Sequence, residues 1–234
     1  PSISRPWWLL WPLAPAARKL RSLHPAANGA TPLALIASPY ELARARGVSP
    51  LGDMNFVLAS ASPARLEALR RAGLSPSVHV SGVDESLATS NDPSELVTEL
   101  AALKCQAVAS EHRDALVLGC DSVLWFDGQI LGKPHTPEVA KARWQQMRGR
   151  SGVLYTGHCL RLGDREVQRS VATTVHFADI TDTEIDAYIA TGEPLHVAGS
   201  FTIDGLGGAF VEGIEGDHLN VIGVSISTVR TMVE

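Results

Sequence analysis

The chain has 234 residues, of which 25 are acidic and 20 are basic, and its formal net charge is -5. This mild acidity argues against a protein that coats nucleic acid, because such proteins are normally basic. A hydrophobic content of 45% and a charged content of 19% exclude a disordered chain and are typical of a globular one with a full core.

The first 53 residues differ in composition from the remainder of the chain. They hold three of the five tryptophans, and their apolar segment Trp7–Ala17 is interrupted by prolines and too short to span a membrane. Only Arg5 precedes that segment and no clear cleavage site follows it, which argues against a secretory signal. We expect residues 1–53 to be a poorly ordered extension, or translated sequence upstream of a start at Met54, and residues 54–234 to form the domain.

The regular pattern opens with a strand, a helix and a second strand. Asn55–Ala59 is a short apolar segment typical of a strand, and Val78–Val83 is a candidate for the next strand. Between them, Ser62 and Pro63 have the residue types of a helix N-cap and first turn, and Gly73 would end that helix.

The middle of the chain predicts a helix, a hairpin and another helix. Asp92–Glu111 starts with an Asp-Pro-Ser-Glu sequence that resembles a capping box, so we expect a long helix there. Ala115–Phe126 is strongly apolar and predicts a strand, and Asp127-Gly128 after it is a hairpin signal. Thr136–Gly149 begins with Thr-Pro and predicts the next helix.

The C-terminal part adds three strands and two helices. Val153–Leu162 and Val167–Ala178 flank a Gly-Asp hairpin signal, and Thr181–Gly192 begins with a Thr-x-x-Glu capping box. A glycine-rich stretch, 199–208, leads into a strand near Ala209–Glu215, and a last helix closes the chain. Because strands, helices and hairpins alternate, we expect an α/β or α+β chain with a mixed, twisted sheet.

The loop after the first strand has the residues of an anion site. Ser60 and Ser62 precede the first helix, whose N-terminal N–H groups and dipole attract anions. Arg65 can hold a phosphate with two parallel hydrogen bonds. The alternative is simple N-capping by Ser62.

Two acidic segments are candidates for base or metal chemistry. Asp121 lies inside the apolar segment Leu116–Phe126, where an unpaired carboxylate is costly, so we expect it to face a cleft as a general base or metal ligand. A satisfied structural aspartate or a strand bulge would also explain it. Asp84 and Glu85 form an acidic pair that could hold Mg²⁺ beside phosphates, or could be a solvated loop.

Two lysines are candidates for binding phosphate. Lys133 follows the hairpin in a Leu-Gly-Lys-Pro turn, and Lys104 lies in an apolar-rich helix, where it would face a polar cleft. An exposed turn lysine and a surface lysine with a buried stem are the alternatives. Together with the hydroxyls and carboxylates, these lysines indicate phosphoanhydride chemistry with a metal and an activated water.

The glycine-rich stretch, the cysteines and Trp144 exclude several other kinds of site. The glycine-rich stretch 199–208 matches neither the dinucleotide-binding pattern nor the P-loop. Cys105, Cys120 and Cys159 have no C-x-x-C spacing, which argues against a zinc site or a disulfide framework and favours a reducing cytoplasm. Trp144 has the helical spacing of a core residue rather than of a base-stacking platform.

Several motifs follow one another in order from residue 54 onward. They are LASASPARLEAL at Leu58–Leu69, VDE at Val83–Glu85, Ala101–Ala107 around Lys104, GCDSVL at Gly119–Leu124, LGKP at Leu131–Pro134, Gly149-Arg150 with Tyr155–Gly157, GEP at Gly192–Pro194, Ala198-Gly199, and NVIG at Asn220–Gly223. This order resembles that of the Maf family of nucleoside triphosphate pyrophosphatases, and most of all its actinobacterial form. The resemblance covers about residues 54–234.

The resemblance implies a fold similar to inosine triphosphate pyrophosphatase, with two lobes around a cleft. It implies hydrolysis of the α–β phosphoanhydride, with Mg²⁺ or Mn²⁺, to a nucleoside monophosphate and pyrophosphate. The catalytic carboxylate would be Asp121, and the metal would lie at Glu85 and Asp121. The substrate-binding residues would be Ser60, Ser62, Arg65, Glu85, Lys104, Ser122, Lys133 and Asp204.

The chain departs from the family pattern at four motif positions. Ala64 replaces the first arginine of Ser-Pro-Arg-Arg, Ser122 replaces a threonine, and Val197 replaces the lysine of Asp-Lys-Ala-Gly. Asp204 replaces a glutamine that helps to select pyrimidine bases. A carboxylate only accepts hydrogen bonds, so Asp204 would favour a base edge that presents N–H groups, as guanine does. Branches of the family that act on 7-methyl-GTP carry an acidic residue there.

We therefore predict a cytoplasmic hydrolase of nucleoside triphosphates, including modified ones, with no nucleic-acid or membrane partner. The family resemblance also implies a homodimer and a link to septum formation. The departures at Ala64 and Val197 leave an alternative open, namely a regulator of cell division that binds nucleotides without hydrolysing them.

Overall fold

The computed structural model describes residues 54–234, and the expectations for residues 1–53 lie outside the described residues. The strands are β1 (Phe56–Leu58), β2 (Ser77–Val78), β3 (Leu116–Phe126), β4 (Gln129–Leu131), β5 (Ser151–Leu162), β6 (Arg165–Phe177) and β7 (Val211–Glu215). The α-helices are α3 (Pro63–Arg71), α4 (Pro93–Ala109), α5 (Pro137–Met147), α6 (Asp182–Ala190), α7 (His218–Ile222) and α8 (Ile226–Val233). Short 3-10 helices cover Glu85–Leu87, Glu193–His196, Ala198–Ser200 and Leu206–Phe210.

One mixed sheet contains all of these strands. Its order is β2-β1-β3-β5-β6-β7, and β4 pairs with β3 beside that path. β1 is parallel to β2 and to β3, whereas the remaining pairs are antiparallel. The prediction of an α/β chain with a mixed sheet and flanking helices is confirmed.

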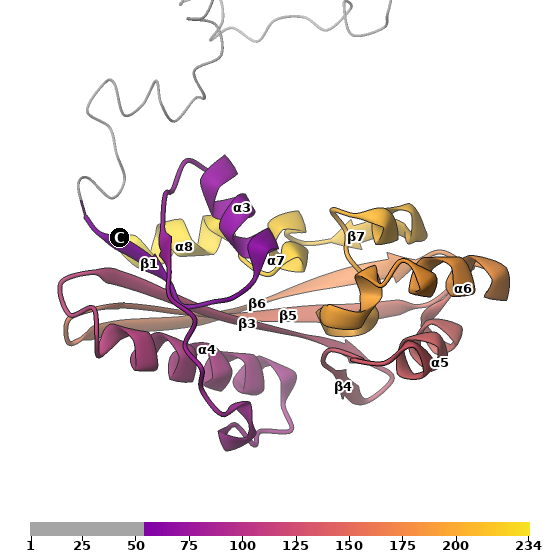
Figure 1. The fold of residues 1–234 in the computed structure, drawn as a ribbon, viewed down its shortest axis with the longest axis horizontal. Coiled ribbons are helices and arrows are strands. Elements are labelled where there is room, and N and C mark those ends of the chain that lie inside the picture. Colours follow the sequence, from indigo (N-terminus) through magenta and orange to yellow (C-terminus); the bar gives the residue numbers. More distant parts are fainter. Residues whose placement is uncertain (1–53) are drawn as a thin grey trace, which may run out of the picture. The chain divides into compact units, whose positions relative to one another are not determined.

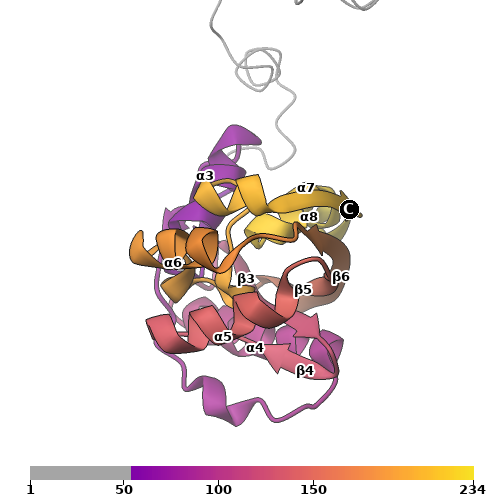
Figure 2. The ribbon, with the colours of Figure 1, turned by 90° about the vertical axis from the view of Figure 1, so that its right-hand side faces the viewer.

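Helices cover both faces of the sheet (Figure 1). Because side chains alternate along a strand, Val57 and Val117 pack against α4, whereas Leu58 and Leu118 join the core under α3 and α8. Figure 2 shows α4 on the side of the sheet opposite α3 and α7. The carboxyl end of β1 therefore emerges between two helical layers, where the loop to α3 begins.

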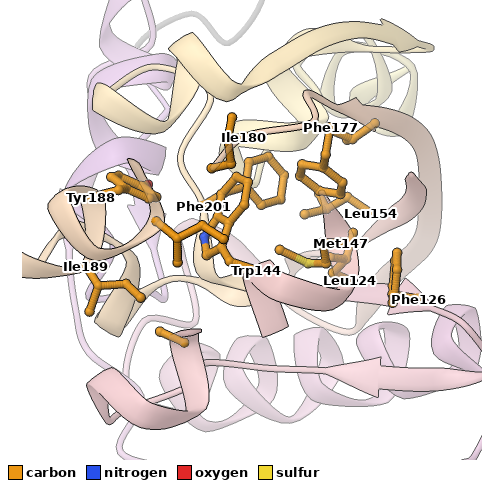
Figure 3. Close-up of a cluster of buried hydrophobic side chains, with 13 residues drawn as sticks. Leu124, Phe126, Trp144, Met147, Leu154, Phe177, Ile180, Tyr188, Ile189 and Phe201 are labelled. Atoms are coloured by element: carbon orange, nitrogen blue, oxygen red, sulfur yellow. The ribbon is translucent and has the colours of Figure 1, made fainter. Parts of the chain in front are cut away.

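A second group of helices, α5 and α6, encloses an aromatic core at the other end of the long strands (Figures 1 and 3). Trp144 lies at its centre, fully buried, with ring centroids 5.6 Å from Phe177 and 5.7 Å from Tyr188 in edge-to-face contacts. Its indole N–H donates to the Ser200 carbonyl over 2.7 Å. The prediction that Trp144 is a core residue is confirmed.

The N-caps of the predicted helices are present. Ser62, Asp92, Thr136 and Thr181 each accept a backbone N–H with the side chain, and Thr181 forms a complete capping box with Glu184. No helix among residues 54–234 is long and apolar enough to cross a membrane.

The strand predicted at Val78–Val83 is wrong beyond its first residue. β2 ends at Val78, and the His79 N–H makes one further bond to the Leu58 carbonyl, over 3.1 Å. Gly82 then has a φ of 61°, in the left-handed region that a strand cannot include. The chain leaves the sheet at this point, and residues 80–83 line a cleft instead.

The sequence prediction also missed α7, which Asp217 caps and Gly223 ends. It missed the 3-10 helices within the glycine-rich stretch as well.

Candidate active site

A cleft of about 570 Å³ lies beside the carboxyl end of β1, where the loop to α3 begins. Its walls are the β1–α3 loop, residues 80–85, α4, β3, and the segments around residues 133, 196–204 and 221–222. Every site residue predicted from the sequence lines it: Ser60, Ser62, Arg65, Glu85, Lys104, Asp121, Ser122, Lys133 and Asp204. Their side chains come from six separate parts of the chain, so the fold brings them together.

The β1–α3 loop is held by its own hydroxyls. The Ser62 side chain accepts the Arg65 N–H at 3.3 Å, and the Ser62 N–H donates to Ser60 Oγ at 3.2 Å. Ser62 is therefore the helix cap that the alternative interpretation expected, although it also lines the cleft.

Arg65 is engaged by the protein itself rather than standing free as a phosphate clamp. Its guanidinium donates to Gly223 O (2.8 Å), Ser60 Oγ (3.1 Å), Cys120 O (3.0 Å) and Ser122 Oγ (3.0 Å). These four bonds leave one guanidinium N–H for a substrate oxygen. Arg65 thus ties the β1–α3 loop to β3 and to the end of α7.

A buried polar chain, which the sequence did not reveal, continues from Ser122. Its hydroxyl lies 2.8 Å from Thr156 Oγ1, which donates to the Asn220 carbonyl at 3.0 Å. Thr156 and Asn220 are fully buried, and the Asn220 amide donates to the carbonyls of Leu154 and Val171. The sequence signals were the motifs Tyr155–Gly157 and Asn220–Gly223, which gave no pairing because the partners are far apart in the sequence.

Lys104 joins the two carboxylates of the cleft. Its Nζ lies 2.5 Å from Asp121 Oδ1 and 2.7 Å from Glu85 Oε1, and 12% of its side chain is exposed. The hydrogen bond from Lys104 lowers the pKa of Glu85 despite its partial burial, and the charges of Lys133 and Arg65 add to the effect. Lys104 is therefore part of the cleft wall and does not extend along the surface.

Asp121 sits in an unbroken stretch of β3, opposite Gly157 of β5, so the bulge explanation is wrong. The structural explanation holds in part, because Lys104 satisfies one carboxylate oxygen. However, 14% of the side chain is exposed and it lines the cleft, as a base or ligand requires.

Two glycines explain why α4 lies close enough for this contact. A Cβ at Gly119 would lie 2.3 Å from the Ala101 carbonyl oxygen, and one at Gly157 would lie 2.0 Å from that of Val97. Only glycine permits such an approach. The close packing brings Lys104 on α4 to Asp121 on β3.

Another part of the cleft lining consists of Lys133 and the loop that ends at Asp204. Asp204 is exposed, and Phe201, Thr202 and Ile203 line the cleft before it. These residues supply an apolar surface and a carboxylate beyond the lysines. Such a surface suits the nucleobase of a nucleotide.

Glu193, which sequence reasoning did not single out, holds this loop. Its carboxylate accepts from Tyr188 Oη (2.9 Å), Leu206 N (3.0 Å), Gly207 N (2.9 Å) and the Thr202 hydroxyl. Burial alone would raise the pKa of Glu193, but these hydrogen bonds outweigh it and lower the pKa. The Gly-Glu-Pro motif was the only signal for this role.

Glu85 and Asp121 could hold a metal. Within residues 54–234 no group of three or more His, Cys, Asp or Glu side chains is arranged for one. Mg²⁺ is usually held by one or two carboxylates together with substrate phosphates and water. The two carboxylates therefore fit a metal that arrives with a triphosphate, but not a metal held by protein ligands alone.

Comparisons with known proteins give one family model and several relatives that match this chain. The family model described as Maf-like protein matches residues 55–234. The chain is 56% identical over 187 residues to a protein of Salinispora tropica, covering 77% of this chain and 83% of that one. It is 53% identical over 190 residues to a protein of Streptomyces coelicolor, covering 80% and 92%. It is 51% identical over 181 residues to a protein of Corynebacterium efficiens, covering 76% and 92%. Each relative is named nucleoside triphosphate pyrophosphatase.

Proposed function

Because the chain belongs to the Maf-like protein family, we propose that it is a nucleoside triphosphate pyrophosphatase. It hydrolyses a nucleoside triphosphate at the α–β phosphoanhydride, releasing the monophosphate and pyrophosphate. The observation that carries the proposal is the contact of Lys104 with Asp121 and Glu85 inside one cleft. A base and a cation beside one another are what hydrolysis of an anhydride needs.

Asp121 is the catalytic base of this proposal. Lys104 occupies Oδ1, so the other oxygen is available to accept a proton from the attacking water. The water oxygen then bonds to phosphorus, the anhydride bond breaks, and its electron pair leaves with pyrophosphate. Lys104 holds the carboxylate in place while the proton is transferred.

The triphosphate charge is met by the cations of the cleft. Lys133 and Lys104 both line the cleft, and Arg65 offers its remaining N–H. Glu85 and Asp121 would hold Mg²⁺ or Mn²⁺ together with the phosphates. When bound, the metal would supply positive charge at the phosphate oxygens.

Asp204 supports a preference for bases with N–H groups on the edge that faces it. We expect Asp204→Gln to lower the ratio of kcat/KM for GTP or 7-methyl-GTP to that for UTP or TTP by about tenfold, the size of one lost charged hydrogen bond. Steady-state pyrophosphate release with each nucleotide measures this ratio. An unchanged ratio would remove Asp204 from base selection.

The test of the function uses the full chain and a panel of ordinary and modified nucleoside triphosphates, with and without Mg²⁺ or Mn²⁺. Pyrophosphate and orthophosphate are quantified separately, and we expect metal-dependent pyrophosphate release alone. Release of orthophosphate alone would place the cleavage at another bond. Nucleotide binding without any release would favour the regulator that Ala64 and Val197 leave open.

Location and partners stay predictions. Cys105, Cys120 and Cys159 are unpaired, which supports a reducing cytoplasm. The homodimer and the link to septum formation rest on the family resemblance, and we propose no membrane or nucleic-acid partner.

A further inference from the structure

Lys133 lies on a short connection between β4 and α5 that is hydrogen-bonded to the segment 195–200. The His135 N–H donates to the Leu195 carbonyl at 3.1 Å, and the Gly199 N–H donates to the Gly132 carbonyl at 3.3 Å. Two segments of the cleft wall, residues 132–136 and 195–200, are therefore joined through their backbones.

Arg143 of α5 hydrogen-bonds to both of these segments. Its Nη1 donates to the Gly132 carbonyl at 2.6 Å and to Ser200 Oγ at 3.4 Å. The next residue, Trp144, donates to the Ser200 carbonyl from the aromatic core. Burial lowers the pKa of Arg143, and Arg143 does not line the cleft.

We infer that Arg143 is a positioning residue for Lys133 and acts through the Gly132 carbonyl. That oxygen accepts two hydrogen bonds, one from Arg143 and one from Gly199. The peptide group is planar, so holding the Gly132 oxygen also places the N and Cα of Lys133. The inference rests on the proposed function in so far as Lys133 binds the triphosphate.

A lysine could not take over this role. Both hydrogen bonds leave from Nη1, whose two N–H groups are fixed in the guanidinium plane, whereas the N–H groups of an ammonium rotate at the end of a flexible stem. Arg143→Lys should therefore behave like Arg143→Met rather than like the wild type.

The experiment is a double-mutant cycle with Arg143→Met and Lys133→Met in the full chain. The Kd of inorganic tripolyphosphate in the presence of Mg²⁺ is measured by calorimetry, because this probe carries no base. We expect each single variant to weaken binding by roughly tenfold, as for a charge-assisted contact. In the Lys133→Met background, Arg143→Met should change Kd by less than about twofold, because its effect passes through Lys133.

Arg148→Met is the matched control. Arg148 ends α5 and donates to the Ile180 carbonyl at 3.2 Å and to Asp182 at 2.6 Å, outside the cleft lining. Its Kd should equal that of the wild type. Thermal melting checks that each variant is folded, and Arg143→Lys takes the place of Arg143→Met if the latter does not fold.

The inference would be overturned if the two substitutions weakened tripolyphosphate binding additively in the double variant. An unchanged Kd in Arg143→Met would also overturn it. So would a wild type that does not bind tripolyphosphate. Binding of tripolyphosphate without pyrophosphate release from any nucleotide would contradict the proposed function alone, and the cycle would still decide the inference.

Discussion

Lys104 carries one positive charge between two carboxylates, and this sets the electrostatics of the cleft. Asp121 and Glu85 lie 2.5 and 2.7 Å from its Nζ, so the three side chains together remain negative. A triphosphate adds further negative charge. Under the proposed function, Lys133 and a divalent metal would offset this charge as the triphosphate approaches Asp121.

At the residue scale, Asp121→Asn tests the base. The amide keeps the size of the side chain but cannot accept a proton, so we expect kcat to fall by about 100- to 10,000-fold. The midpoint of thermal unfolding should change little, because Asp121 is a partly exposed strand residue.

The control for this variant is Asp127→Asn, in the exposed hairpin beyond β3, where the carboxylate pairs with Arg150. Its kcat should equal that of the wild type. An Asp121→Asn variant with full activity would remove the base from the mechanism.

Glu193→Gln tests the loop that carries Asp204. The carboxylate accepts hydrogen bonds from Tyr188, Thr202, Leu206 and Gly207, and the NH₂ of an amide would face some of these donors. We expect a loss of about 1–2 kcal/mol in the free energy of unfolding at pH 7. Glu212→Gln, on the exposed side of β7, should cost nothing measurable.

The difference in the free energy of unfolding between the wild type and Glu193→Gln should depend on pH in one direction. The pKa of Glu193 is lower in the folded protein than the ordinary 4.5, so its stabilisation is complete above that value. The stabilisation is lost as the pH falls through the lowered pKa. Denaturant unfolding of both proteins from pH 7 to pH 3 should show the difference shrinking below pH 4.5, and a constant difference would contradict this account.

At the element scale, the approach of α4 to the sheet decides where Lys104 lies. Gly157→Ala would place a methyl group 2.0 Å from the Val97 carbonyl oxygen, so α4 must move outward. We expect a loss of about 2–4 kcal/mol in the free energy of unfolding. The activity of the folded fraction should also fall, because Lys104 moves away from Asp121.

Gly213→Ala in β7 is the comparison for this variant, since its Cβ would meet no atom closer than 3.9 Å. Urea unfolding and kcat of both variants measure the two effects. Equal stability of the two variants would show that the helix does not depend on this glycine.

The predicted elements differ in how strongly local residues determine them. The sequence predicted the N-caps at Ser62, Asp92, Thr136 and Thr181 because each capping side chain accepts a backbone N–H only a few residues away. The strand predicted at Val78–Val83 was wrong because apolar residues favour a strand only where a neighbouring strand is available to pair with it. This segment runs along the sheet edge for one residue beyond β2 and then turns away at Gly82.

At the scale of the whole molecule, the three cysteines report on the packing of both faces of the sheet: Cys105 and Cys159 lie in the core with α4, and Cys120 lies in the core under α3 and α8. All three thiols are buried and unpaired. Burial raises the pKa of Cys120 to about 12. Its contribution to stability is complete below the ordinary thiol value of 9.0 and is lost as the pH rises toward 12.

We expect these thiols to react with iodoacetamide only after global unfolding, since thiolate and access are both needed. Mass spectrometry of samples labelled along a urea series should show three modifications appearing together with the unfolding transition. A single thiol that reacts in the native protein at neutral pH would contradict the packing described for the two faces of the sheet.

The sequence by itself determined the order of most of the elements, many of their caps and hairpins, and the residue types of the candidate site. These follow from local hydrogen bonding, from hydrophobic periodicity and from the ordered motifs. Every predicted site residue does line one cleft, yet their partners could not be read from the chain.

Only the tertiary structure decided that Arg65 binds Ser122 and Gly223, that Lys104 spans two carboxylates, and that Glu193 and Arg143 hold the segments that carry Asp204 and Lys133. The physical reason is distance along the chain. The Arg65–Gly223 bond joins residues 158 positions apart, and such a contact depends on how closely the helices approach the sheet rather than on local preference.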